Sequence, residues 1–230
     1  MKKHLRHLTE RDHKILEFIA LYRIGTVELL ATACFHGTSH ENVTRVLRRL
    51  EGRELIRKID AALSFSYFVL APRGYEALGM EARTPRTLTE QTLPVLLAVA
   101  QYCVKNRLCR MTSREFTSTF PELCRPGMNS SNYVVISDGG KSKLQFLVVD
   151  RGGAAHRIKS RVGRIIGQRK GIPAFYSLMM AGRFRITVLT GTDEQQAKIE
   201  RRVSRAKFSP VEVTAYVIPE LAELLMLRKK

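Results

Sequence analysis

The amino-acid sequence predicts an α+β protein built from two parts. In residues 1–80, apolar side chains repeat at helical spacing in three segments and then alternate as they do in strands. In residues 131–219, short apolar runs typical of strands alternate with longer amphipathic runs typical of helices. The stretch between the two parts is polar and holds a glycine and a proline. We therefore predict domains at 1–80 and 93–230, joined by a linker at 81–92.

The composition excludes several classes of protein. No apolar run approaches the roughly 18 residues that span a membrane, and the basic N-terminus lacks an uninterrupted apolar stretch and a cleavage site. We therefore expect a cytoplasmic protein with no membrane partner. The four cysteines, at 34, 103, 109 and 124, form no C-x-x-C pair, and no histidine pair has metal-ligand spacing. A structural zinc site is not expected.

The positive charge is concentrated in the C-terminal half. The formal net charge of the chain is +18, and residues 131–230 hold 19 Lys or Arg against 8 Asp or Glu, a net of +11. Such an excess predicts a polyanionic partner, and double-stranded DNA is the partner we favour. Anionic lipid is a weaker alternative, because the basic segments have no aromatic, membrane-seeking face.

Three helices are expected in the first domain. The first follows Thr9, an N-cap candidate with Asp12 three residues on in a loose capping box, and it ends at Gly25. The second follows Thr26, and the third follows Ser39. In the third helix an apolar stripe formed by Val43, Val46, Leu47 and Leu50 predicts the buried face. The opposite face carries His40, Asn42, Arg45, Arg48, Arg49 and Arg53.

Two strands and a short helix are expected next. Residues 55–60 and 64–71 are rich in β-branched and aromatic side chains, with a turn at Ala61–Leu63 between them, and "PRGYEALG" is a short helix. This order is that of a winged helix-turn-helix, whose third helix enters the major groove of DNA. Some such domains bind only protein, but the basic third helix favours DNA.

The predicted DNA contacts of the first domain divide by position. Asn42 and Arg45 lie near the start of the third helix, where base edges are read. The remaining basic residues of the helix and of the wing are expected to contact phosphates or to lie near them. They are Arg48, Arg49, Arg53, Arg57 and Lys58.

The second domain is predicted to be a mixed α/β sheet with flanking helices. An apolar helix at 92–108 and an irregular stretch at 111–131 precede two strands joined by "DGGKSK". A helix at 154–170, a strand, a helix, a strand and a last helix follow. This order suits the PD-(D/E)XK restriction-endonuclease-like core. Between residues 151 and 170 there are seven Lys or Arg and no acid, which adds as DNA-contact candidates Arg151, Arg157, Lys159, Arg161 and Arg164.

The chain resembles the replication-relaxation family of mobile-element proteins, which includes mobilisation relaxases unlike the usual HUH type. The likeness runs through "LTERDHKILEFIALYRIGTVELLATACF", "NVTRVLRRLEGRELIRK", "YFVLAPRGYEAL" and "FLVVDRGG", and so covers most of the chain. The resemblance implies a winged helix followed by a nuclease-like domain. It also implies a role in conjugative mobilisation at an origin of transfer, in the relaxosome, or in plasmid replication.

The nuclease motif of that family is degenerate here. The family pattern has Pro-Asp before the hairpin and Glu-x-Asp-Arg-Gly at the end of its second strand. This chain has Pro126-Gly127 in the first place and Val148 in the position of the Glu, and it keeps Asp150 followed by Arg151. A metal-dependent nuclease needs at least two acids on neighbouring strands, so Asp150 is left as the one plausible ligand.

Asp150 is therefore expected to serve the fold, as an ion-pair partner or as an N-cap of the helix at 154–170. Arg151 would then contact phosphate or take part in an ion pair. Asp138, the other acid nearby, falls in the hairpin turn, where a metal ligand is not expected. No cofactor is expected unless the nuclease is active, in which case Mg²⁺ or Mn²⁺ would bind.

Three functions stay open from the sequence. The leading one is a DNA-binding accessory protein of a plasmid or integrative element, with a relaxase or a second copy of the chain as protein partners. The second is an active relaxase that nicks DNA, using Asp150 with Asp138 or a distant acid, or using Tyr133 or Tyr176 as a nucleophile. The third is a winged-helix transcriptional regulator.

Overall fold

The protein has a mixed α+β fold, as the sequence predicts, and it divides into two compact units, Met1–Leu96 and Leu97–Lys230. A computed structural model describes residues 8–35, 37–61, 65–85, 87–128, 130–206 and 208–227. The division between the units falls inside the helix α5 (Leu93–Lys105).

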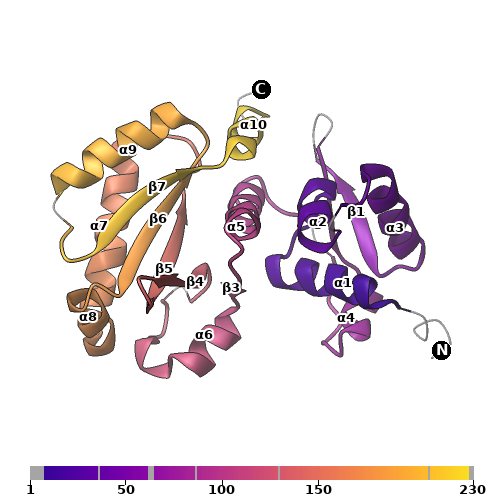
Figure 1. The fold of residues 1–230 in the computed structure, drawn as a ribbon, viewed down its shortest axis with the longest axis horizontal. Coiled ribbons are helices and arrows are strands. Elements are labelled where there is room, and N and C mark those ends of the chain that lie inside the picture. The colour runs from indigo at the N-terminus through magenta and orange to yellow at the C-terminus, as the bar shows by residue number, and fades with distance from the viewer. Residues whose placement is uncertain are drawn as a thin grey trace. The chain divides into compact units, whose positions relative to one another are not determined.

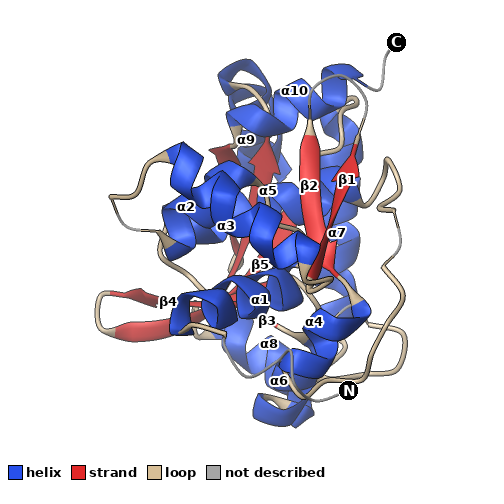
Figure 2. Cartoon of the chain, turned by 90° about the vertical axis from the view of Figure 1, so that its right-hand side faces the viewer, coloured by secondary structure: helices blue, strands red, loops and turns tan. Residues whose placement is uncertain are grey.

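The first unit has the element order that the sequence predicts (Figure 1). Its elements are α1 (Glu10–Tyr22), α2 (Val27–Cys34), α3 (His40–Gly52), β1 (Ile56–Asp60), β2 (Ser66–Leu70) and α4 (Pro72–Ala77). Figure 2 shows β1 and β2 side by side, and they pair antiparallel from Ile56 opposite Leu70 to Asp60 opposite Ser66. Ala62 and Leu63, in the turn predicted between these strands, lie outside the described residues.

The three predicted N-caps of the first unit are confirmed. The side chains of Thr9, Thr26 and Ser39 each accept a hydrogen bond from the backbone of the first turn, and Thr9 completes a capping box with Asp12. The predicted end of the first helix at Gly25 is wrong. The helix ends at Tyr22, because the following residue takes the left-handed conformation and closes the last turn.

The second unit contains a five-stranded sheet in the order β3-β4-β5-β6-β7. β3, β4 and β5 pair antiparallel, whereas β5, β6 and β7 pair parallel. The strands are β3 (Arg110–Met111), β4 (Tyr133–Asp138), β5 (Lys141–Val149), β6 (Phe184–Thr190) and β7 (Glu212–Val217). The helices besides α5 are α6 (Ser113–Thr119), α7 (Ala155–Lys170), α8 (Pro173–Met180), α9 (Asp193–Ala206) and α10 (Pro219–Leu227), with a 3₁₀ turn at Pro121–Leu123.

Two sequence-based expectations for this unit need correction. The stretch at 111–131, expected to be irregular, contains α6 and the 3₁₀ turn, because Thr112 and Glu115 form a capping box that starts a helix. The hairpin turn is also tighter than "DGGKSK" suggested. Gly139 and Gly140 form a two-residue turn with φ of 57° and 76°, which only glycine adopts easily, so both strands continue to the turn.

The two faces of the larger sheet differ in character. Leu144, Phe146 and Val148 point from β5 into an apolar core shared with α7, α8 and α9. The alternate side chains of β5 point to the other face, where Gln145 Nε2 donates to the hydroxyl of Tyr102 at 2.8 Å. Within the described residues, no helix is long and apolar enough to cross a membrane.

Candidate nucleic-acid interface

The exposed face of α3 is the first candidate surface. Val43, Val46, Leu47 and Leu50 are buried, as predicted, so the polar side chains of the helix are turned outward. Asn42, Arg45, Arg48 and Arg49 are exposed. The Nη2 of Arg45 donates to Oδ1 of Asn42 at 2.6 Å, which holds these two side chains next to each other on the first half of the helix.

The other basic residues predicted near this surface differ in whether their side chains form ion pairs or hydrogen bonds within the protein. Arg48 and Arg57 are exposed, and neither has an ion-pair or hydrogen-bond partner among the described residues. Lys58 is paired with Asp60 at 2.9 Å. Arg53 is the half-buried C-cap residue of α3. The side chains with the most freedom to meet a phosphate here are therefore Arg48 and Arg57.

Arg49 stabilises the fold as well as lying on the exposed face of α3, a role that the sequence did not predict. Its Nη2 forms an ion pair with Oδ1 of Asp12, whose side chain is fully buried in α1. Asp12 Oδ2 also accepts the backbone N–H of Thr9 at 3.1 Å, so both carboxylate oxygens are in use. Arg49 thus joins α3 to α1, and part of its hydrogen-bonding capacity is used inside the protein.

A second basic surface lies on the helices that cover the larger sheet. Arg157, Lys159 and Arg164 are exposed on α7, as predicted, and Arg151 is exposed in the loop before it. The neighbouring helix α9 packs along α7 and adds the exposed cations Arg201, Arg202 and Arg205, which were not predicted as DNA contacts. The run "ERRVSRA" was the signal that could have found them.

Arg161 is the exception among the predicted contacts of α7. It is half-buried, and its Nη1 donates to the backbone carbonyl of Val149 at 3.0 Å, so it ties α7 to the end of β5. Burial lowers the pKa of Arg161, and the neighbouring cations Arg151 and Arg164 lower it further. The guanidinium group of Arg161 is therefore repelled by those of Arg151 and Arg164, and the carboxylate of Asp150 partly offsets this repulsion.

Asp150 lies directly after β5 and is almost fully buried. Its Oδ1 accepts the backbone N–H of Gly152 at 3.1 Å, and its Oδ2 accepts Nε2 of Gln195 at 3.0 Å. The prediction that Asp150 caps α7 is wrong, because the N-cap residue is Ala154 and no side chain caps the helix. No cation of the described chain forms an ion pair with Asp150. Asp150 instead holds the loop before α7 against α9.

The described residues do not form a metal site around Asp150. They contain no group of three or more His, Cys, Asp or Glu that could hold a metal ion, and Val148 is fully buried in the core. Asp138 ends β4 and pairs with Lys141 at the start of β5, nine residues before Asp150 along that strand, and so lies roughly 30 Å from Asp150. Asn129, near the expected position of the family's Pro-Asp, lies outside the described residues.

Neither tyrosine that the sequence offered as a nucleophile has a nucleophile's surroundings. The hydroxyl of Tyr133 accepts two hydrogen bonds from Arg169, and burial raises its pKa to about 12. Tyr176 is exposed on α8, which precedes the start of β6, whereas Asp150 follows the end of the parallel strand β5. An activated hydroxyl requires a base within hydrogen-bond reach, and the described residues provide none for either tyrosine.

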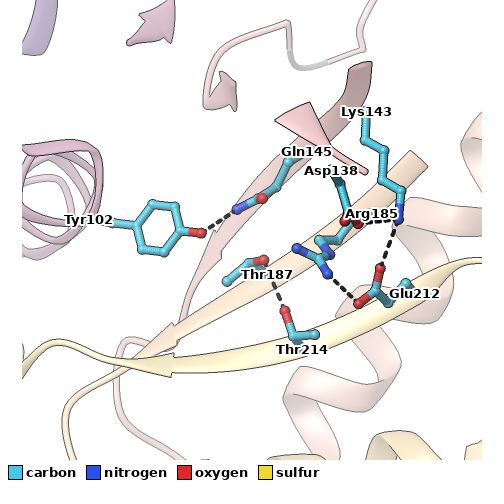
Figure 3. Close-up of polar contacts among 8 residues, drawn as sticks. All are labelled: Tyr102, Asp138, Lys143, Gln145, Arg185, Thr187, Glu212 and Thr214. Carbon is cyan, nitrogen blue, oxygen red and sulfur yellow. Dashed lines mark hydrogen bonds and ion pairs between the residues drawn. The ribbon is translucent and has the colours of Figure 1, made fainter. Parts of the chain in front are cut away.

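A network of charged side chains crosses the other face of the sheet (Figure 3). Lys143 Nζ lies 2.6 Å from Oδ2 of Asp138 and 3.7 Å from Oε2 of Glu212, and Arg185 pairs with Glu212. Hydrogen bonding to Lys143 lowers the pKa of Asp138, and hydrogen bonding to Arg185 lowers the pKa of Glu212. The two cations balance the two carboxylates, and the four side chains come from β4, β5, β6 and β7, so the network joins all four strands on this face.

The contacts of Asp150 lead to a prediction about its ionisation. Burial raises the pKa of Asp150, and the hydrogen bonds from Gln195 and Gly152 oppose that rise by stabilising the carboxylate. Gln195→Ala removes one of the donors, so we expect the pKa of Asp150 to rise further in this variant. The measurement is an NMR titration of the side-chain carboxyl carbons. Gln196→Ala is the control, since Gln196 bonds to Glu200 and to the carbonyl of Ala215; an equal shift in both variants would contradict the assignment.

No protein-family model matches the chain, and no curated protein matches it.

Proposed function

We propose that this protein binds double-stranded DNA, with its N-terminal unit acting as a winged helix-turn-helix. Three helices, an antiparallel pair of strands and a short helix follow one another in the order of that fold. In this proposal α3 enters the major groove, and the paired strands β1 and β2 form the wing. The observation that carries the proposal is the exposed face of α3, where Arg48 has no partner among the described residues and Asn42 and Arg45 lie next to each other.

The residues of this surface divide into two roles. Asn42 and Arg45 are proposed to read base edges, because amide and guanidinium groups make paired hydrogen bonds with purines in the major groove. Arg48 and Arg57 are proposed to bind phosphates, because both are exposed cations without a partner in the described chain. Arg49 is assigned chiefly to the fold through its ion pair with Asp12.

The C-terminal unit is proposed to be a restriction-endonuclease-like scaffold that holds DNA without cutting it. The order α5, β3, α6, β4, β5, α7, α8, β6, α9, β7, with an antiparallel first part and parallel pairing of β5, β6 and β7, supports this scaffold. The exposed cations of α7 and α9 form a surface for the phosphate backbone. Cutting would need a second acid beside Asp150, and the position where the family has one is occupied by Val148, which is buried in the core.

The resemblance to the replication-relaxation family supports a role for this DNA binding in a mobile element. We propose an accessory protein that marks an origin of transfer or a replication origin of a plasmid or integrative element, where a relaxase would be a partner. A transcriptional regulator would use the same residues of α3. The location of the bound sites, found by sequencing DNA captured with the protein, distinguishes the two.

Salt-dependent DNA binding tests the proposal. We expect the full chain to bind a mixed-sequence duplex, with an affinity that falls steeply as salt rises, measured by fluorescence anisotropy. The double variant Arg48→Ala/Arg57→Ala should reduce the slope of log K against log salt by about 2, since each lost phosphate contact removes about 0.9. Lys14→Ala is the control, because Lys14 is paired with Glu10 at 2.7 Å on α1. No binding at low salt, or an unchanged slope in the double variant, contradicts the proposal.

A further inference from the structure

A cavity of about 720 Å³ lies in the first unit, and this volume is in the range of sites for small organic ligands. The end of α1, the strand β2 and the helix α4 line it, and so do described residues of the segment 83–92. That segment leads from α4 to α5 and was predicted to be a linker. It therefore does more than connect two parts of the chain, since it also forms part of the wall of this cavity.

Hydrogen bonds hold the segment 83–92 against the rest of the unit. The backbone N–H of Leu88 donates to the hydroxyl of Tyr67 at 2.9 Å, and Tyr67 is buried in β2. The hydroxyls of Thr89 and Thr92 bond to each other at 2.9 Å. The carbonyl of Thr89 also accepts the N–H of Leu93, the first residue of α5, at 2.9 Å. These bonds fix this wall of the cavity in place.

Two arginines without partners line the cavity. Arg23 and Arg83 are both exposed, and the side chain of neither forms an ion pair or a hydrogen bond within the part of the chain that the structure describes. The described lining holds no acidic residue, so no carboxylate balances the two cations there. A guanidinium is a planar group whose N–H donors match the oxygens of a carboxylate or a phosphate. The charge of the lining therefore favours an anion.

The backbone conformation of Arg23 is one that favours glycine. Arg23 ends α1 in the left-handed region, with φ of 64°. Glycine is the usual residue at such a helix end, because the Cβ of any other residue comes too close to the following carbonyl oxygen. The side chain of Arg23 makes no bond to the described protein that would offset this cost. A ligand bound to its guanidinium would offset it.

The rest of the lining combines an apolar surface with hydroxyl groups. Ile19, Val69 and Leu70 supply the apolar part. The hydroxyls of Tyr75, which is half-buried on α4, and of the exposed Thr87 have no hydrogen-bond partner among the described residues. Such a lining matches a ligand that carries an anionic group on a small apolar body.

We propose that this cavity binds a small organic anion. Its carboxylate or phosphate group bonds to the guanidinium groups of Arg23 and Arg83, and its apolar body lies against Ile19 and Val69. The site goes beyond the proposed DNA binding, because none of its residues lies on α3. DNA binding can therefore fail while this site binds its ligand, and the reverse also holds.

Nuclear magnetic resonance titration of the full chain tests the site. The probes are phenyl phosphate, benzoate, inorganic phosphate and the neutral benzyl alcohol. We expect both organic anions to shift the backbone amide signals of residues 19–23 and 87–92 with saturation, and benzyl alcohol to leave these signals unchanged. Inorganic phosphate should bind more weakly than phenyl phosphate, because it lacks an apolar body.

The comparison between probes also identifies the anionic group. Tighter binding of phenyl phosphate shows that the arginines bind a phosphate, and tighter binding of benzoate shows that they bind a carboxylate. The proposal fails if neither organic anion binds, or if benzyl alcohol binds as tightly as the anions do.

Arg23→Gly locates the ligand without disturbing the helix end. Glycine adopts the left-handed conformation more easily than arginine, so thermal stability should stay the same or rise. The affinity for the organic anions should fall about tenfold, since a charge-assisted hydrogen bond is lost. Arg83→Ala should have a similar effect on affinity. Lys14→Ala is the control on α1, because this cation is paired with Glu10 and lies outside the lining of the cavity.

The same variants separate this site from the DNA surface. Arg23→Gly and Arg83→Ala should bind the mixed-sequence duplex as tightly as their parent does. Loss of duplex affinity without loss of anion affinity would show that the two arginines contact DNA, and it would overturn the proposal. Unchanged anion affinity in both variants would overturn it as well.

Discussion

Replacing Arg169 with alanine is expected to lower the free energy of unfolding of the C-terminal unit by about 3–5 kcal/mol. Arg169 is 2% exposed, and its guanidinium lies 4.5 Å from the centroid of the Phe146 ring. Its Nε and Nη2 donate to the hydroxyl of Tyr133 at 2.8 and 2.6 Å, and its Nη1 donates to the carbonyl of Ile165 at 3.2 Å. The alanine leaves a cavity and a buried Tyr133 hydroxyl without these donors, so two costs add.

Urea denaturation followed by circular dichroism measures this loss. Lys170→Ala is the neighbouring control, because Lys170 is exposed and its change should stay within about 0.5 kcal/mol. Arg169→Met fills the cavity but still leaves the Tyr133 hydroxyl without its hydrogen-bond donors. Its loss of stability should therefore lie between those of Arg169→Ala and Lys170→Ala. Adding Tyr133→Phe to Arg169→Met removes the orphan and should recover stability. A loss below about 1 kcal/mol in Arg169→Ala would show that the buried cation is not a fixed part of this core.

Arg169 also shows where residue type misleads a reading of the sequence. The stripe of Ile158, Val162, Ile165 and Ile166 predicted the buried face of α7 correctly. Position 169 continues that stripe at helical spacing, since it lies four residues after Ile165 and three after Ile166. Because the residue is an arginine, helical spacing alone does not predict that it is buried. Aromatic rings from β4, β5 and α8 surround it, and such distant partners are not visible in local periodicity.

Local signals predicted the helices of the first unit from their caps, but they did not predict α6 and α8 of the second unit. The caps at Thr9, Thr26 and Ser39 predicted three helices of the first unit. The same kind of signal at Thr112 was overlooked, because the seven-residue helix α6 lies in a Ser/Thr-rich stretch with little apolar periodicity. The eight-residue helix α8 likewise has Pro173 in its first turn and was not predicted.

The candidate surface was predictable in outline, and its internal contacts were not. Helical spacing placed Asn42, Arg45 and Arg48 on the exposed side of α3, where the structure has them. The ion pair between Arg49 and Asp12 joins residues 37 positions apart, so only the packing of α1 against α3 reveals it. Asp150 is likewise buried and bonded to Gln195, 45 positions away, through the packing of distant segments, which local sequence patterns do not show.

Arg49→Ala is expected to lower the free energy of unfolding of the N-terminal unit by about 2–3 kcal/mol. The substitution leaves the carboxylate of Asp12 fully buried without its cation, and only the N–H of Thr9 remains bonded to its side chain. Breaking a fully buried pair costs about 3–5 kcal/mol, but the side chain of Arg49 is 42% exposed, so solvent screening reduces the loss. Thermal and urea denaturation of the full chain measure it.

Arg48→Ala is the matched control for Arg49→Ala, since the two arginines are neighbours on α3 and both are exposed. Arg48 has no partner among the described residues, so its loss should leave stability unchanged and weaken DNA binding at every salt concentration. Arg49→Ala should show the opposite pattern, a clear loss of stability and a smaller loss of DNA affinity than Arg48→Ala. The affinity must be measured well below the unfolding temperature of the variant. Equal stability in the two variants would show that Asp12 does not need Arg49. Greater loss of affinity in Arg49→Ala would instead place this arginine on the DNA.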